Sequence, residues 1–382
     1  MESLFSFVPA ALYQSIFISV IFGLCLIIAI NYSFSTTNEK LAVNMPIAQI
    51  GAFALTALVI LFVGFRPISS VFVDMSMYTH VYNNIYDGTM ESVNDQRGEW
   101  LFYAYGNFCK RIGLSDVMYI FSLSAIYFGL MLIACWRLMR NNLFVAILFC
   151  LASFSCFAYA VNGIRNGMAC SIVMVGVSLL GGKRWEQILA IALMFCAYNI
   201  HHSTALPCFC ALSAWIFVKD TKWAIYFWIA SIFISFIAGN YVTEFFVDLG
   251  FDERMDNYAN LDEQGNLLAS ENEKSGFRID FILYSIMPII MAWYVTVKRN
   301  FKDNMYNIIA ITYILANAFW IMVIRSEQSN RFAYLSWFLY PLVIAYPLLR
   351  MNIWEDQDRK TGLILLAYSG FTFFMHFIYY GS

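Results

Sequence analysis

The chain has 382 residues, of which 61% are hydrophobic, 18% aromatic and only 13% charged, with a formal net charge of −2. Soluble globular proteins carry about 25% charged residues, so this composition excludes that class. The slightly acidic balance argues against a nucleic-acid-binding protein, which needs a basic face. Apolar runs long enough to cross a bilayer recur along the whole length, which predicts an all-α polytopic integral membrane protein.

The apolar runs predict about twelve transmembrane helices within one transmembrane domain, 1–382. No Lys or Arg precedes Lys40, so the first run lacks the basic region of a cleavable signal peptide and is expected to stay as a span. Several runs are near the lower length limit for a span. In chain order the predicted spans are 8–31, 47–65, 117–135, 143–161, 166–181, 187–200, 203–218, 223–246, 281–297, 305–324, 332–349 and 361–379.

Positive charge alternates between the turns that join these spans. Cytoplasmic turns are rich in Lys and Arg, which assigns one set of turns to the cytoplasm and places both termini outside it. That set contains Lys40; Arg137 and Arg140; Lys183 and Arg184; Lys219 and Lys222; Lys298, Arg299 and Lys302; and Arg350, Arg359 and Lys360.

The opposite, outer side holds two long connections, 66–116 and 247–280, which we predict to be periplasmic loops. The first is rich in Tyr, Asn and acidic residues and is expected to form interfacial helices. Exposed Tyr and Trp among carboxylates and amides suit sugars, whose apolar faces stack on aromatic rings. The alternative interpretation is the aromatic belt that many membrane proteins place at the lipid headgroups.

Cationic side chains and histidines collect at the outer ends of the spans. Ionisable groups at membrane depth are costly, so their collection on one side indicates a functional site. The residue types favour an anionic, phosphate-bearing, lipid-linked substrate, and no metal-ligand pattern accompanies them. The residues are Arg66, Arg165, His201, His202, Arg325 and Arg331.

Arg165 lies in VNGIRNG, at the outer turn between two predicted spans. A guanidinium offers a planar fork of donors and stays charged when partly desolvated, which suits a diphosphate. Its place between Gly163 and Gly167 favours close backbone approach. The alternatives are an arginine that reaches the headgroups and a GxxxG packing motif.

His201 and His202 open the predicted span HHSTALPCFCALSAWIF. A histidine at the mouth of an outward cavity can accept a proton near neutral pH or donate to a phosphate oxygen. Two adjacent residues cannot face the same way on a helix, so at most one is expected to be central. A satisfied interfacial histidine is the alternative for either.

Further charged candidates lie on the same side. Arg325 and Arg331 bracket IRSEQSNRFAYLSWF, and one arrangement pairs Arg325 with Glu327 and leaves Arg331 at a helix start. Asp74 and Glu99 are outer carboxylates that can deprotonate a sugar hydroxyl, although most such groups are solvated loop charges. No P-loop, dinucleotide fingerprint, HExxH or G-x-S-x-G motif is present in the sequence, so the energy for any reaction should arrive with the substrate.

Five segments in order resemble the EpsG-like group of bacterial polysaccharide polymerases, the Wzy-type O-antigen polymerases. The resemblance covers roughly residues 60–350. Each segment alone is weak, whereas the ordered set is specific. The segments are FRPISSVFVDMSMYTHVYNNI, GEWLFYAYGNFCKRIGLSDVMYIF, VNGIRNGMACSIVMVGVSLL, NIHHSTALPCF and NRFAYLSWFLYPL.

The family's motif residues can be placed on this chain one by one. The His-x-Ser/Thr-Ala-Leu pattern falls on His202, Thr204, Ala205 and Leu206, which prefers His202 over His201. The spacing between Arg66 and Asp74 differs somewhat from the family pattern. The other matching positions are Arg66, Asp74, Tyr78, Glu99, Arg165, Asn166, Arg331 and Tyr334.

The resemblance implies a GT-C-like membrane glycosyltransferase of the bacterial inner membrane with its active site facing the periplasm. Its substrate would be an undecaprenyl-diphosphate-linked oligosaccharide, polymerised without nucleotide or metal, with membrane lipids and a chain-length regulator protein as further partners and no nucleic acid. Expected roles are catalysis by His202, Arg165, Asp74 and Glu99; diphosphate binding by Arg165, Arg331, Arg66 and Arg278; and sugar binding by Tyr78, Asn166 and Tyr334.

Three other classes stay open. An O-antigen ligase uses the same donor but transfers to lipid A core, and the residues alone do not separate it from a polymerase. A flippase for lipid-linked oligosaccharides would need cations along a whole transport path, whereas here they gather on one face. A membrane-bound acyltransferase would need its histidine near an acyl donor, usually on the cytoplasmic side.

Overall fold

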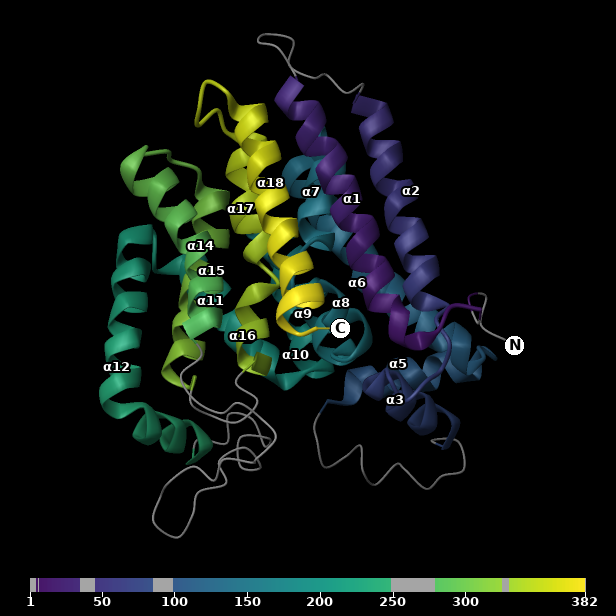
Figure 1. Ribbon diagram of the computed structural model, residues 1–382. Coiled ribbons are helices and arrows are strands. Elements are labelled where there is room, and N and C mark those ends of the chain that lie inside the picture. Colours follow the sequence, from purple (N-terminus) through teal and green to yellow (C-terminus); the bar gives the residue numbers. More distant parts are fainter. Residues whose placement is uncertain are drawn as a thin grey trace. The chain divides into compact units, whose positions relative to one another are not determined.

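The computed structural model describes residues 5, 7–34, 45–84, 99–248, 279–324 and 330–381. The predictions for Lys40, Arg278, Arg325 and Glu327 lie outside these residues. Every regular element in the described part of the chain is a helix (Figure 1), which confirms an all-α membrane protein. The chain packs as two compact units, 1–179 with 183–201 and 345–382, and 180–182 with 202–344.

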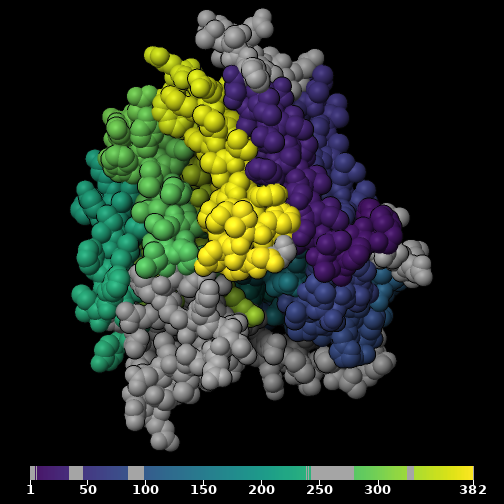
Figure 2. Space-filling model, viewed as in Figure 1, coloured from purple at the N-terminus to yellow at the C-terminus, as the bar shows by residue number. Residues whose placement is uncertain are grey.

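The first unit is built on pairs of long apolar helices. α1 (Tyr13–Phe34) packs along α18 (Gln357–Phe374), and Figure 2 shows the two side by side on one face. α2 (Met45–Gly64) packs on α6 (Asp116–Met139), which a 3₁₀ turn joins to α7 (Leu143–Leu151). These helices carry apolar residues all round, as expected of segments that face lipid on one side and protein on the other.

Shorter helices complete the first unit. α3 (Val73–Asn84) and α5 (Trp100–Arg111) run across the direction of α1 and α2 in Figure 1. Both fall within the connection 66–116. The remaining helices are α8 (Cys156–Val161), α9 (Ile164–Leu180) and α10 (Arg184–Ile200), and α17 (Tyr340–Arg350) begins in the second unit and ends in the first.

The second unit is organised around α15 (Asn304–Met322), most of whose side chains are buried. Against it pack α11 (Ala205–Ile216), α12 (Thr221–Asp248), α14 (Ile279–Trp293) and α16 (Asn330–Trp337). Asn317 links three of these helices, because its amide accepts from Trp228 Nε1 at 2.8 Å and donates to Ser336 Oγ at 3.0 Å. A polar group buried in an apolar core has to be satisfied in this way.

The predicted count of twelve spans is not confirmed. Within the described residues, seven helical stretches are long and apolar enough to cross a membrane, and α9 and 221–237 are shorter apolar helices. Residues 203–218 were predicted as a span, but α11 has only 12 residues. At 1.5 Å per residue it covers about 18 Å, less than the roughly 30 Å hydrocarbon core. The seven stretches are Ala10–Ser33, Pro46–Gly64, Asp116–Leu151, Ile279–Lys298, Asn304–Met322, Arg331–Arg350 and Gln357–Tyr379.

The predicted span 143–161 is broken in the middle. α7 ends at Leu151 and α8 begins at Cys156, so four residues interrupt the helix. Side chains from other helices satisfy the exposed carbonyls, since Thr372 donates to Ala152 O at 2.8 Å and Tyr127 to Cys156 O at 3.2 Å. Broken helices are tolerated at membrane depth where protein covers the freed backbone groups.

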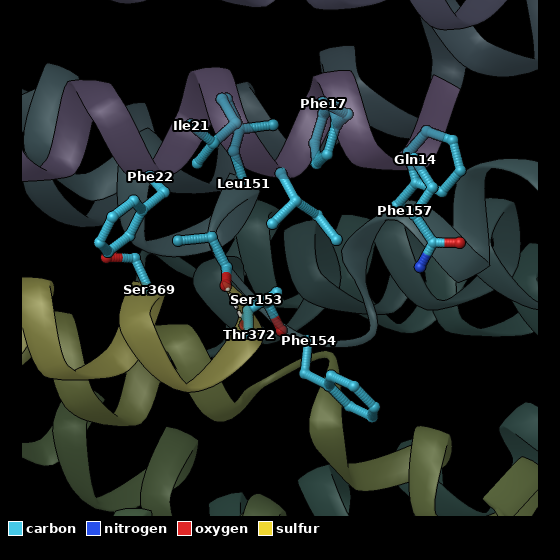
Figure 3. A pocket seen from close by; sticks show the side chains of 12 residues that line it. Gln14, Phe17, Ile21, Phe22, Leu151, Ser153, Phe154, Phe157, Ser369 and Thr372 are labelled. Atoms are coloured by element: carbon cyan, nitrogen blue, oxygen red, sulfur yellow. Dashed lines mark hydrogen bonds between the residues drawn. The ribbon is translucent and has the colours of Figure 1, made fainter. Parts of the chain in front are cut away.

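A small pocket lies at this break between α1, α7, α8 and α18 (Figure 3). Its walls are mainly apolar, with Phe17, Phe22 and Phe157 among them, and hydroxyls of Ser153, Ser369 and Thr372 face it. It includes none of the charged residues that the sequence singled out.

Candidate active site

Helix ends carry the charged residues of the first unit. Arg66 follows α2, Asp74 and Tyr78 lie on α3, and Glu99 precedes α5. Arg165 is the second residue of α9, and His201 follows α10. Helix ends leave backbone groups unpaired and are natural places for polar side chains. The structure thus brings together residues that lie far apart in the sequence.

The centre of the site is a buried cluster of Arg165, Glu99 and His201. Arg165 Nη1 donates to Glu99 Oε2, and His201 Nδ1 lies 2.7 Å from Glu99 Oε1. All three are buried, with relative exposures of 5–6%. One carboxylate therefore holds a guanidinium and an imidazole at once, in a setting where electrostatic interactions are stronger than in water. We call these three residues the Arg–Glu–His cluster.

Glu99 lies at a helix start, where a polar side chain usually caps the helix. It is the N-cap residue of α5, yet its side chain makes no capping hydrogen bond. Asp, Ser, Thr and Asn at this position normally use their side chain to accept from the first N–H groups of the helix. Here both carboxylate oxygens turn to Arg165 and His201 instead. Its carboxylate thus serves the cluster and leaves the helix end uncapped.

The start of α5 is fastened to the end of α10, which fixes the geometry between Glu99 and His201. Trp100 Nε1 donates to Asn199 Oδ1 at 2.7 Å, and the Asn199 amide donates back to Phe195 O within α10. His201 itself is extended, with φ −154° and ψ 110°, because α10 ends at Ile200. The direction of its ring is therefore set by an extended residue and not by a helix face.

Asp74 positions the helix start that carries Arg165. Its Oδ2 accepts from the backbone N–H of Ile164 at 3.1 Å, at the first residue of α9. A carboxylate at a helix N-terminus pairs an otherwise unsatisfied N–H and interacts favourably with the helix dipole. Because Arg165 is the next residue, this bond sets the start of α9 from which the guanidinium projects.

Aromatic rings pack around the guanidinium of Arg165. Its carbon lies 5.5 Å from the ring centre of Tyr78 and 5.9 Å from that of Phe102, and these two rings contact each other edge-on at 5.1 Å. Cations over aromatic faces are stabilised when desolvated. Tyr78, predicted to bind sugar, is itself buried beneath Arg165. The Nε of Arg165 is buried without a hydrogen-bond partner.

Arg66 is a second buried guanidinium of the same unit, with a relative exposure of 0%. Its Nη1 donates to Val63 O at 2.6 Å and its Nη2 to Ala160 O at 3.4 Å, while its Nε has no partner. In the described part of the chain no carboxylate lies within ion-pair distance of it. Burial lowers the pKa of Arg66 to about 9, although the negative field of Asp74 acts in the opposite direction. A buried charge without an ion pair is costly to the fold.

The remaining predicted residues are placed as follows. Asn166 is half-buried on α9 and accepts from the Cys170 thiol at 3.2 Å. His202, Arg331 and Tyr334 belong to the second unit. His202 begins a 3₁₀ turn, and Arg331, exposed, lies at the start of α16 as predicted. Tyr334 is half-buried with its ring 5.6 Å from that of Trp337.

His201 was given less weight than His202 in the sequence interpretation, yet it is the histidine that contacts Glu99. The sequence held one local signal for the contact. WLFYAY after Glu99 predicts a helix that begins there, and the first N–H groups of a helix need hydrogen-bond acceptors. That signal does not identify His201 as the residue that contacts Glu99.

Among the described residues, no three His, Cys, Asp or Glu side chains form a metal-binding group.

Gly167 explains why α8 and α9 approach so closely beside Arg165. A Cβ at Gly167 would lie 2.7 Å from Tyr159 O and 3.1 Å from Tyr159 Cβ, whereas one at Gly163 would meet nothing closer than 3.6 Å. Alanine gains about 1 kcal/mol of helix propensity over glycine, but overlap with a backbone oxygen cannot be relieved by a rotamer change. The glycine is required at 167 and not at 163.

We therefore expect Gly167→Ala to lower the thermal unfolding midpoint of the purified protein, by a destabilisation of about 1–3 kcal/mol. Gly163→Ala is the matched control and should unfold like the wild type, because its Cβ makes only ordinary contacts. The measurement is thermal unfolding in detergent. Equal midpoints for the two variants would contradict a close contact at Gly167.

The fold and the site define a polytopic helical membrane protein with buried cations and a carboxylate at the ends of its helices. A protein-family model described as the EpsG family matches residues 49–382, most of the chain, so the chain belongs to the EpsG family of polysaccharide-polymerase-like membrane proteins. This confirms the family that the sequence motifs indicated. No curated protein and no solved structure matches the chain.

Proposed function

We propose that this protein is a bacterial polysaccharide polymerase, a GT-C-like glycosyltransferase that joins undecaprenyl-diphosphate-linked oligosaccharide repeat units on the periplasmic face of the inner membrane. The observation that carries the proposal is the buried Arg–Glu–His cluster with Arg66 in the same unit of an EpsG-family chain. A diphosphate leaving group needs preorganised positive charge, and a sugar nucleophile needs a base.

In this proposal Arg165 supplies the positive charge that the diphosphate leaving group needs. Its pairing with Glu99 uses Nη1, Tyr78 also interacts with the guanidinium, and Nε is buried without a hydrogen-bond partner. In the proposed reaction, the donors that Glu99 does not occupy contact the phosphate oxygens. A guanidinium fork matches two phosphate oxygens at once. Arg66 would add a second cation, and Arg331 and Arg278 are proposed to add further contacts to the diphosphate. Stabilisation of the leaving diphosphate is an electrostatic task that such groups perform well when desolvated.

The sequence left the base open among His202, Asp74 and Glu99. Asp74 accepts from the start of α9, and Glu99 is engaged by the Arg165 guanidinium and the His201 imidazole, so both carboxylates are better suited to positioning than to proton transfer. Tyr78, Asn166 and Tyr334 are proposed to bind sugar, Tyr78 after rearrangement since it is buried. No nucleotide or metal enters the proposed reaction.

The test is direct reconstitution. Purified protein in detergent is incubated with a lipid-diphosphate-linked repeat unit, without added nucleotide, and the products are separated on a gel. A ladder of regularly spaced bands is the expected result. Intact substrate in the presence of folded protein would overturn the polymerase proposal. Addition of lipid A core as acceptor then distinguishes a ligase, which would give one product, from a flippase, which would give none.

A further inference from the structure

We propose that His201 is the general base of the polymerisation reaction and that Glu99 is its positioning residue, in an arrangement that also ties the base to the diphosphate-binding Arg165. This inference rests on the proposed function and names the group that takes the proton. It assigns the role to a histidine other than the one that the family pattern favours.

The tautomer of His201 follows from its contact with Glu99. An ionised carboxylate can only accept hydrogen bonds, so at 2.7 Å the His201 Nδ1 must carry the proton and donate to Glu99 Oε1. In neutral imidazole the lone pair then lies on Nε2, which becomes the basic atom. A carboxylate on the opposite side of the ring also stabilises the imidazolium that forms when Nε2 accepts a proton.

Arg165 keeps Glu99 in the form that this arrangement needs. A buried carboxylate would tend to take up a proton, but an adjacent guanidinium favours its ionised form. In the described part of the chain, the charged and titratable groups at the cluster include Glu99 at the start of α5 and Arg165 at the start of α9, with Tyr78 of α3 and Tyr103 of α5 around the guanidinium. Glu99 thus binds His201, the proposed base, through one carboxylate oxygen and Arg165, the proposed anion-binding cation, through the other.

The proposed step balances as follows. His201 Nε2 takes the proton of the acceptor sugar's hydroxyl as that oxygen forms a bond to the anomeric carbon of the donor. The bond between this carbon and the diphosphate oxygen breaks, and its electron pair leaves with the lipid diphosphate. The leaving group, held by Arg165, later takes the proton from the imidazolium. The products are the lengthened glycan and the lipid diphosphate, and His201 returns to its starting form.

The variants compare the two adjacent histidines and the carboxylate. His201→Asn places an amide N–H where Nδ1 stood, so the bond to Glu99 can remain while the base is lost. His202→Asn is the same change one residue later. We expect kcat/KM for ladder formation to fall by about 100-fold or more in His201→Asn, and by much less in His202→Asn. A larger loss in His202→Asn, or His201→Asn within about threefold of wild type, would overturn the proposal.

The pH profile separates a base from a structural residue. Wild-type kcat/KM should rise with pH along a limb near neutrality, as the base loses its proton. Glu99→Gln removes the charge that stabilises the imidazolium, so this limb should move to lower pH by about one unit. His201→Asn should lose the limb. An unmoved limb in Glu99→Gln, or a limb retained in His201→Asn, would contradict the assigned roles.

A substrate-free measurement keeps this inference separate from the proposed function. The chain has 4 histidines, so nitrogen-15 labelling gives few imidazole signals, and the His201 signal is assigned by its loss in His201→Asn. We expect the Nδ1–H tautomer at neutral pH. An Nε2–H tautomer would overturn the inference even if polymer forms. A protein with the expected tautomer but no wild-type ladder would instead overturn the polymerase function.

Discussion

Replacing Arg165 by lysine is expected to lower kcat/KM for polymer formation by about 100- to 1,000-fold, the usual effect of removing one preorganised donor from a charge-stabilising site. Lysine keeps the positive charge and can still pair with Glu99. It cannot present a planar fork, because its ammonium is a compact point charge. The fall in kcat/KM would therefore measure the contribution of the Arg165 N–H groups that do not bind Glu99.

The chain contains a matched control for this substitution. Arg137 also pairs with a glutamate, Glu186, but its side chain has a relative exposure of 32% and the pair joins α6 to α10 away from the cluster. Exposed ion pairs contribute little to stability. Arg137→Lys should therefore leave polymer formation near the wild-type level. Equal losses in Arg137→Lys and Arg165→Lys would remove the evidence for a specific role at 165.

A double variant tests whether Arg165 and Glu99 serve only to hold the fold. Truncating one member of a buried ion pair costs about 3–5 kcal/mol, whereas replacing both by apolar residues is often neutral or stabilising. Arg165→Met with Glu99→Leu should therefore stay folded, with an unfolding midpoint near that of the wild type, and make no polymer. Polymer from this folded double variant would show that the pair is structural only.

Part of the fold could be predicted from the sequence because hydropathy is a local property. Long apolar runs identified a helical membrane protein, and the helices at 45–64 and 304–322 lie close to their predicted ranges. Hydropathy could not show the break between α7 and α8. That break is stabilised by Thr372, which is distant in sequence and contributes a hydroxyl to a freed carbonyl.

The sequence predicted which cationic residues belong to the candidate site, but not which residues contact one another there. Arg165 attracted attention through its flanking glycines, and Gly167 indeed lies against the backbone of Tyr159. The preference for His202 came from the family pattern, which says nothing of where the His201 ring lies. In the structure α10 ends at Ile200 and His201 is extended, so its ring points where no helical face would place it. Pairing with Glu99 depends on how α5 packs on α10, which local patterns do not encode.

Replacing Arg66 by methionine is expected to leave the protein at least as stable as the wild type while polymer formation falls by about 100-fold. Arg66 is fully buried, its Nε lacks a partner, and burial lowers its pKa to about 9. A desolvated charge without an ion pair destabilises the fold by several kcal/mol, and methionine fills similar space with no such penalty. Stability and activity should therefore change in opposite directions, as they do where a strained group serves function.

Ligand binding distinguishes this role from a structural one. A ligand that binds the folded state raises its unfolding midpoint, so a soluble diphosphate, inorganic pyrophosphate, should stabilise the wild type and not Arg66→Met. Arg140→Met is the control for loss of one positive charge, since Arg140 is exposed and stacks 5.3 Å from Trp136; its response to pyrophosphate should match the wild type. If Arg66→Met instead unfolds at a lower temperature and retains the response to pyrophosphate, its hydrogen bonds to Val63 O and Ala160 O are its main contribution. Opposite changes in stability and activity, with loss of that response, would show that the buried charge is kept for the anion and not for the fold.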